Sequence, residues 1–156
     1  MILPDDIYSQ KLLELAAAMP RTERLQAPQA TVRAHSKLCG SRVEIDLVMD
    51  SYVVTNYGQT VRACLLGQTA ASIMGREIVG SSAGELREIG AAIRKMLKQG
   101  GPPPSGKWGD LALLEPVRDY KARHASTLLV FDAVEDAIAQ IEAKRAGAHD
   151  DATPST

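Results

Sequence analysis

Strand-like patterning is confined to one stretch of this chain, residues 43–63, and helical spacing precedes and follows it. Hydrophobic and polar residues alternate over residues 43–48, which is typical of a strand with one buried face. A turn signal at 50–51 is followed by β-branched and aromatic residues at 52–57, and 59–63 form a short third run. We therefore expect an α+β fold, in which a three-stranded antiparallel meander carries helices on one side.

Helices are expected on both sides of this stretch in the sequence, each from apolar residues that recur at helical spacing. They cover residues 7–19, a segment of small residues from Leu65, a segment that begins at the capping-box pair Ser82 and Glu85 and ends at Gly100, and about residues 125–144. The small residues after Leu65 predict a helix that approaches a neighbour closely. Residues 22–37 and 102–106 are expected to be irregular, and residues 111–114 to form one helical turn.

Composition bounds the function and the organisation of the chain. The 156 residues fit one domain, expected over residues 1–146, with a polar, disordered tail over 147–156. A net charge of −1 and 4% aromatic residues argue against a nucleic-acid partner. No apolar run approaches the roughly 20 residues of a membrane span, and the first residues do not have the pattern of a signal peptide. We therefore expect no membrane partner and a cytoplasmic location.

The chain has two cysteines, which is too few for a disulfide framework. Cys64 lies at the predicted start of a helix, where unpaired backbone N–H groups favour a thiolate, and Cys39 lies in a loop before the first predicted strand. If the first and third predicted strands pair, both thiols lie at one end of the sheet, as a soft-metal site requires. His124 could join such a site. Another interpretation stays open, since a lone cysteine is more often a small buried hydrophobic residue.

Several motifs follow one another in a known order. They are Tyr8-Ser9-Gln10-Lys11, Pro20-Arg21, Cys39-Gly40-Ser41, Cys64 followed by Thr69-Ala70-Ala71-Ser72-Ile73-Met74, and residues 117–131 around Ser126. Over residues 8–141 this series resembles the U-type iron–sulfur cluster assembly scaffolds, which comprise the NifU N-terminal domain and the IscU and SufU proteins. The segment that begins at Cys64 is the most specific of these matches.

The resemblance implies a scaffold or carrier and not an enzyme. Its cargo would be iron or a labile [2Fe–2S] cluster held through Cys39 and Cys64, with zinc as the less favoured alternative. Ser126 would lie at the cluster-binding position, and His124 or a second subunit would complete the ligand set. A homodimer could supply two cysteines from each chain. The implied partners are a cysteine desulfurase and recipient apo-proteins.

The chain departs from the family pattern at two site positions. Ser126 stands where the family has its third cysteine, and Ser41 stands where it has an aspartate. A serine hydroxyl is much harder to deprotonate than a thiol and is a poor ligand for iron or zinc. A second hypothesis is therefore a degenerate family member that acts as an interaction or regulatory protein without a cluster. A third, ranked last, is a sulfur transferase that uses a persulfide on Cys64.

Overall fold

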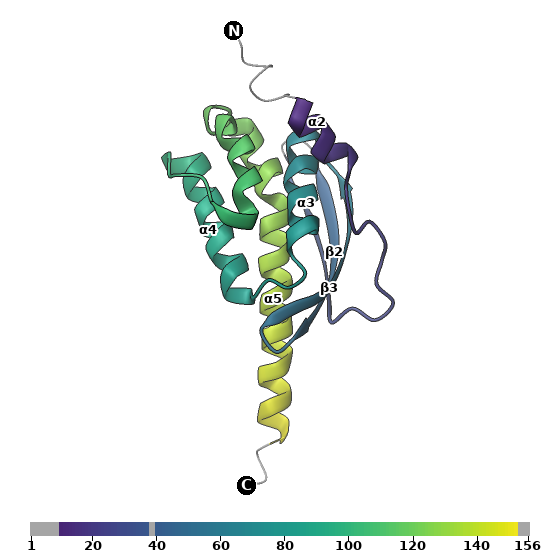
Figure 1. The fold of residues 1–156 in the computed structure, drawn as a ribbon. Helices are drawn as coiled ribbons and strands as arrows, with labels where there is room; N and C mark the ends of the chain where they lie inside the picture. The colour runs from purple at the N-terminus through teal and green to yellow at the C-terminus, as the bar shows by residue number, and fades with distance from the viewer. Residues whose placement is uncertain (1–9, 38–39, 153–156) are drawn as a thin grey trace.

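Figure 1 shows the computed structural model of the chain, which describes residues 10–37 and 40–152. Its three strands, β1 (Ala30–His35), β2 (Arg42–Asp50) and β3 (Val53–Arg62), form one antiparallel sheet in the order β1-β2-β3. The helices cover one face of this sheet. The expected α+β class and three-stranded antiparallel meander are therefore confirmed.

The helical elements form two layers over the sheet (Figure 1). The long last helix packs on β1 and β2, the helix after the sheet packs on β3, and the remaining elements pack against these two. In chain order they are α2 (Gln10–Ala17), α3 (Leu65–Glu77), α4 (Ala83–Gln99), the 3-10 segments η1 (Gly106–Asp119) and η2 (Lys121–Arg123), and α5 (His124–Ala152). Within the described residues, no helix is long and apolar enough to cross a membrane.

The assignment of the strands differs from the expectation in two places. Residues 22–37, expected to be irregular, contain strand β1. The buried face of β1 consists of Ala30, Val32 and the half-buried Ala34, so its hydrophobic alternation is weak. The runs at 52–57 and 59–63, expected to be separate strands, belong to the single strand β3.

Gly58 lies between the two runs that were predicted as separate strands, 52–57 and 59–63. A glycine within a strand pattern indicates a break, but it also permits another backbone to approach closely. Here a Cβ atom on Gly58 would lie 2.2 Å from the carbonyl oxygen of Glu23, and the next residue, Gln59, donates its N–H to the carbonyl of Arg21 at 2.8 Å. The segment 21–25 therefore crosses the face of the sheet that the helices leave open.

Asp46 anchors the same segment from the middle of β2. Its buried carboxylate accepts hydrogen bonds from Arg24 Nε at 2.7 Å, from the backbone N–H of Leu25 at 3.0 Å and from Thr31 Oγ1 at 2.6 Å. Burial alone would raise the pKa of this carboxyl, but the hydrogen bonds from Arg24, Thr31 and Leu25 outweigh it and hold the pKa below its usual value.

The start and end of α4 agree with the sequence signals. Ser82 Oγ accepts the backbone N–H of Glu85 at 3.0 Å, and Gly100 ends the helix with a left-handed φ of 69°. The Glu85 carboxylate also accepts Trp108 Nε1 at 2.8 Å and lies 3.2 Å from Lys107 Nζ. The expected capping-box positions thus also bind the next element.

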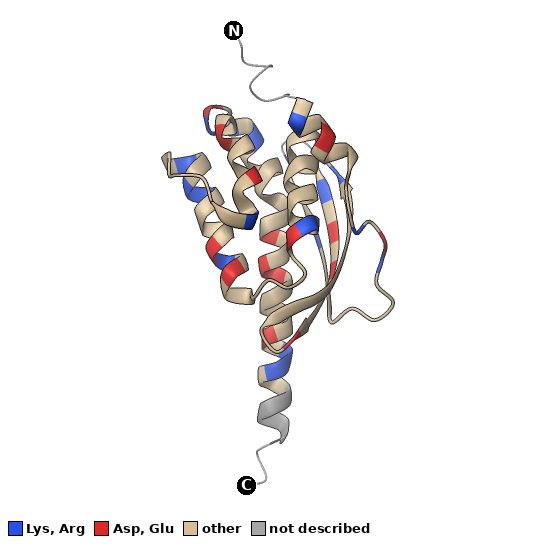
Figure 2. Cartoon of the chain, viewed as in Figure 1, with Lys and Arg blue, Asp and Glu red and all other residues tan. Residues whose placement is uncertain are grey.

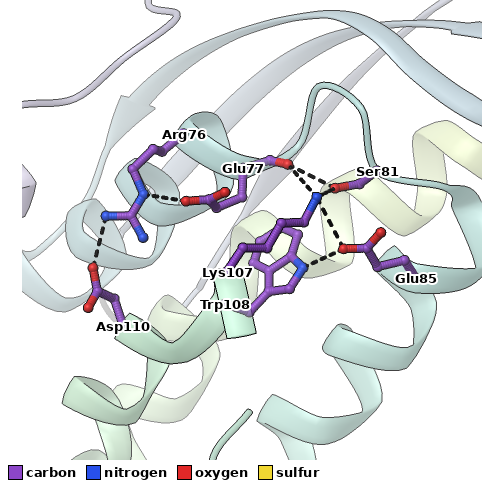
Figure 3. A network of polar contacts seen from close by, with 7 residues as sticks. All are labelled: Arg76, Glu77, Ser81, Glu85, Lys107, Trp108 and Asp110. Carbon is purple, nitrogen blue, oxygen red and sulfur yellow. Dashed lines mark hydrogen bonds and ion pairs between the residues drawn. The ribbon is translucent and has the colours of Figure 1, made fainter. Parts of the chain in front are cut away.

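This contact fixes η1 to the corner between α3 and α4 (Figure 3). Lys107 Nζ donates to Ser81 Oγ at 2.7 Å, Trp108 is buried, and Arg76 pairs with Asp110 at 2.9 Å. The helical turn expected at 111–114 is part of this longer segment. Because η1 leads through η2 into α5, its attachment determines where α5 begins.

Helix α5 continues beyond the expected end at residue 144, through Ala152 and into the expected disordered tail. Lys144 Nζ donates to the carbonyl of Gln29 at 2.7 Å, and Arg145 Nη2 donates to the carbonyl of Met49 at 2.6 Å. The last turns were missed because a polar composition is compatible with a solvated helix as well as with a disordered tail, and Ala, Lys and Arg are strong helix formers.

Gly58→Ala should destabilise the protein by about 2 kcal/mol, because the added methyl group meets a backbone oxygen that cannot rotate away. Urea unfolding measures this change. Gly109→Ala is the matched control, since a Cβ atom there meets nothing within 4 Å. Equal stability of the two variants would contradict the close crossing of β3 by the segment 21–25.

Asp46→Asn should lower the free energy of unfolding at neutral pH by roughly 2 kcal/mol, because charge-assisted hydrogen bonds to a buried group are lost. Since folding depresses the pKa of Asp46, its stabilising effect is present above the unfolded-state pKa of about 4 and disappears as pH falls through the folded-state value. Wild type and variant should therefore converge in stability in acid. Asp50→Asn, at the exposed end of β2, is the matched control and should lower the free energy of unfolding at neutral pH much less than Asp46→Asn.

Candidate functional site

The strand register brings the two cysteine-bearing segments to one end of the sheet. Arg42, at the start of β2, lies opposite Arg62, at the end of β3. The loop before Arg42 and the junction after Arg62 are therefore neighbours. The strand that follows Cys39 thus pairs with the strand that precedes Cys64, which meets the condition under which the two segments lie at one end of the sheet.

Backbone hydrogen bonds join the described residues at the two ends of the loop between β1 and β2. The Ser36 N–H donates to the carbonyl of Ser41 at 2.8 Å, and the Gly40 N–H donates to the carbonyl of Ser36 at 2.9 Å. Gly40 has a φ of 72°, which favours glycine. Cys39 precedes Gly40 in this loop but lies outside the described residues, as does Leu38.

Three side chains from three elements meet where this loop touches α3 and α5. Ser126 Oγ, in the first turn of α5, lies 3.0 Å from Cys64 Sγ and 3.1 Å from Ser41 Oγ. Ser41 and Ser126 are buried, with 3% and 2% of their surface exposed, while Cys64 is half-buried. The cluster thus has two enclosed hydroxyl groups beneath one accessible thiol.

The hydrogen-bond roles in this cluster follow from the protonation of the thiol. A thiolate can only accept, and a serine hydroxyl has one proton to donate. When Cys64 is a thiolate, Ser126 must donate to it, and the Ser126 oxygen is then free to accept from Ser41. The two serines are therefore placed to form a short chain of hydrogen-bond donors that ends at Cys64.

The start of α3 acts in the same direction. Cys64 is the N-cap residue, with extended backbone angles of φ −64° and ψ 171°, and its side chain caps no N–H group. Its carbonyl accepts the N–H of Gln68 at 2.9 Å, which begins the helical ladder. The positive end of the α3 dipole thus lies beside the sulfur and favours negative charge there.

Gly67 permits the close contact between α3 and α5. A Cβ atom at Gly67 would lie 2.8 Å from the Ala63 Cβ, 3.0 Å from Ser126 Oγ and 3.1 Å from the Ser126 carbonyl oxygen. Any larger residue would push Ser126 away from Cys64. This confirms the prediction that the helix after Leu65 approaches a neighbour closely.

His124 is not brought together with this cluster. Its Nε2 lies 3.1 Å from the carbonyl oxygens of both Val117 and Arg118, so the ring is turned toward the end of η1. His124 and Ser126 are two residues apart on α5, and residues at that spacing do not share a helix face. In the part of the chain that the structure describes, no group of three His, Cys, Asp or Glu side chains could hold a metal ion.

The sequence analysis did not anticipate two contacts of this site. Ser41 was identified only as a departure from a family pattern, and nothing in the sequence indicates its hydrogen bond with Ser126 across the fold. Gly67 belongs to the stretch of small residues, which predicted close packing without indicating the partner. Ser126 lies within the first turn of α5, and its hydroxyl faces the thiol.

Known proteins share this architecture. A crystal structure of the N-terminal part of a nitrogen-fixing NifU-like protein from Brucella abortus is 51% identical in sequence, with a TM-score of 0.89, and the match covers 91% of this chain and 99% of that one. The iron–sulfur cluster assembly scaffold protein IscU of Thermotoga maritima is 22% identical over 86% of this chain and 94% of its own length. No family model matches the chain.

A more distant structure shares the fold alone. A protein of Fervidobacterium islandicum, assigned to the SUF system of iron–sulfur cluster assembly, has a TM-score of 0.79 at 18% identity. The Brucella match is close enough and long enough to define the family. The chain belongs to the NifU/IscU-like family, as the motif series around Cys39, Cys64 and Ser126 predicted.

Ser126→Ala should slow the alkylation of Cys64 by iodoacetamide about tenfold at neutral pH, because the thiolate loses its hydrogen-bond donor. The rate is measured in a Cys39→Ala background, in which Cys64 is the remaining cysteine. Thr127→Ala is the control, since it removes a hydroxyl from the same helical turn that is bonded to Arg123 instead. Equal rates in the two variants would exclude Ser126 as a donor to the thiolate.

Proposed function

We propose that this protein is an iron–sulfur cluster assembly scaffold that carries iron or a labile [2Fe–2S] cluster as cargo. The 51% identity to a NifU-like protein supports this, as does the likeness to a curated IscU scaffold. The observation that carries the proposal is the meeting of the Cys39 loop with the start of α3 at Cys64, through Ser41 and Ser126. Nothing in this arrangement requires a reaction catalysed by the protein itself.

Cys39 and Cys64 are the ligands we propose. Thiolates are the usual ligands of iron–sulfur clusters, and Cys64 lies at the start of α3 with its sulfur 3.0 Å from Ser126 Oγ. Ser126 itself is a poor ligand, so we assign it the role of a donor to Cys64 beside the cargo. His124 is not included in the proposed set, because its Nε2 is bonded to backbone carbonyls.

Two thiolates do not complete a cluster site, which normally has four cysteine ligands. We propose a symmetric homodimer in which each chain supplies Cys39 and Cys64. The same four thiolates would suit zinc, which is the less favoured cargo because the family members above are named for iron–sulfur assembly. A cysteine desulfurase as the sulfur donor and apo-proteins as recipients complete this proposal.

A cluster-free family member that binds other proteins is the alternative function. The observation in its favour is that both site positions that depart from the family pattern, Ser41 and Ser126, are buried and hydrogen-bonded to each other. Hydroxyl groups joined in this way are satisfied without a metal. The alternative predicts a protein that stays colourless under all loading conditions.

Anaerobic reconstitution with iron and a sulfide source should give sulfide-to-iron charge-transfer bands and a dimer. Each of Cys39→Ala and Cys64→Ala should abolish the bands and leave the protein monomeric. Visible spectra, iron and sulfide analysis and sedimentation measure these outcomes. Lys37→Ala, at an exposed position in the same loop as Cys39, is the control that should retain the cluster.

The outcomes separate the candidates. Bands that persist in both cysteine variants would refute the proposed ligands. A wild type without iron or colour would favour the cluster-free alternative. Equal binding of zinc and iron by the wild type, both lost in the variants, would retain the site and change its cargo.

A further inference from the structure

The outer face of the sheet is divided into a covered and an open part. Segment 21–25 covers the row formed by Thr31, Asp46 and Gly58. Two further rows of residues follow toward the cysteine-bearing end of the sheet. They are Arg33, Glu44 and Thr60, and then His35, Arg42 and Arg62. Both rows lie beside a groove of about 430 Å³. Its lining comprises Arg33, Ala34, His35, Arg42, Val43, Glu44, Thr60 and Arg62. The sheet therefore has an uncovered concave surface beside the candidate site.

This open surface carries an unbalanced positive charge. Across the strands, His35 lies opposite Arg42, which in turn lies opposite Arg62. Like charges directly opposite each other destabilise a sheet. Glu44, in the next row, is paired with Arg33 at 2.6 Å and with Arg24 at 3.5 Å. Among the described residues, neither Arg42 nor Arg62 has an ion-pair partner.

On α4 and α5, acidic and basic side chains face each other. Figure 2 shows residues of both signs on these two helices. Arg87 pairs with Glu142 at 2.6 Å and Arg94 with Asp132 at 2.6 Å. Arg42 and Arg62 differ from these pairs, because each lies directly opposite a residue of its own sign on the neighbouring strand.

We propose that this surface, defined by Arg33, His35, Arg42 and Arg62, docks an acidic segment of a partner protein. Guanidinium groups bind carboxylates through paired hydrogen bonds. A protein segment fits better than a nucleic acid, because the groove is small and no aromatic side chain lines it for base stacking. Arg62 is two residues from Cys64, and Arg42 follows Ser41, so a segment bound here lies next to the cluster of thiol and hydroxyl groups.

The docking itself does not depend on the cargo. That the partner donates or accepts iron or sulfur rests on the proposed function, whereas the charge arrangement stands without it. Binding is therefore measured on the full chain without iron or sulfide, so that failure of docking and failure of cluster loading are separate results.

The test uses a fluorescent octaglutamate peptide and its anisotropy at low ionic strength. The double variant Arg42→Glu/Arg62→Glu should bind it at least about tenfold more weakly than the wild type. Lys11→Glu/Lys95→Glu makes the same change in net charge at exposed positions on α2 and α4, and should bind nearly as the wild type does. Arg42→Gln/Arg62→Gln, with a smaller loss, guards against misfolding of the double-glutamate variant.

Three results would overturn the proposal. They are no peptide binding by the wild type, equal weakening in the arginine and lysine variants, and displacement of the peptide by a single-stranded oligonucleotide or inorganic phosphate at equal or lower concentration. The last result would assign the surface to phosphate groups. A docking surface for carboxylates would be established by two results together. Peptide binding is weakened selectively in both arginine variants, and neither competitor displaces the peptide from the wild type.

Discussion

The close contact of α3 with α5 at Gly67 and Ser126 is the constraint on which the site depends. Without a side chain at Gly67, the first turn of α5 comes near enough for Ser126 to reach both Cys64 and Ser41. Helix α5 is placed in turn by η1, which is tied to the α3–α4 corner through Lys107 and Trp108. A local close packing thereby joins three segments that are far apart in the sequence.

The chemistry of the group formed by Ser41, Cys64 and Ser126 depends on the oxygen atom that stands at position 126 in place of the sulfur atom of the family pattern. A thiol at position 126 would be a third candidate ligand for iron, whereas the hydroxyl is a weak ligand and a good hydrogen-bond donor. In the proposed site, position 126 would therefore donate a hydrogen bond to a ligand instead of binding the cargo itself. This exchange leaves each chain with Cys39 and Cys64 as thiol donors, which is why the proposed cargo site needs a second copy of the chain.

Sequence reasoning succeeded where burial is periodic and failed where contacts are long-range. The alternation in β2 and the helical spacing in α4 follow directly from their buried faces. Strand β1 was missed because Ala30 and Ala34 contribute little hydrophobic signal. The two runs on either side of Gly58 were predicted as separate strands, and the segment that crosses Gly58 is distant in sequence.

The same limit applies to the candidate site. The meeting of the segments that contain Cys39 and Cys64 was predicted only on condition that the first and third predicted strands pair. They pair because the second and third predicted runs form the single strand β3, beside β2. The orientation of His124 and the bond between Ser41 and Ser126 depend on where α5 begins and how it is rotated. That position is set by η1, for which the sequence indicates only one of its turns.

The outer face of the sheet shows how one constraint leads to another. The segment 21–25 needs Asp46 as a partner for Arg24 and needs Gly58 for its backbone, so it can cover only the rows where those residues lie. The rows nearer the cysteines lack both features and stay open. Folding alone does not account for an arginine opposite another arginine at an open edge, because that arrangement costs stability. The acidic segment proposed to dock here would offset this cost when it binds, which would give the two arginines a physical reason to face each other.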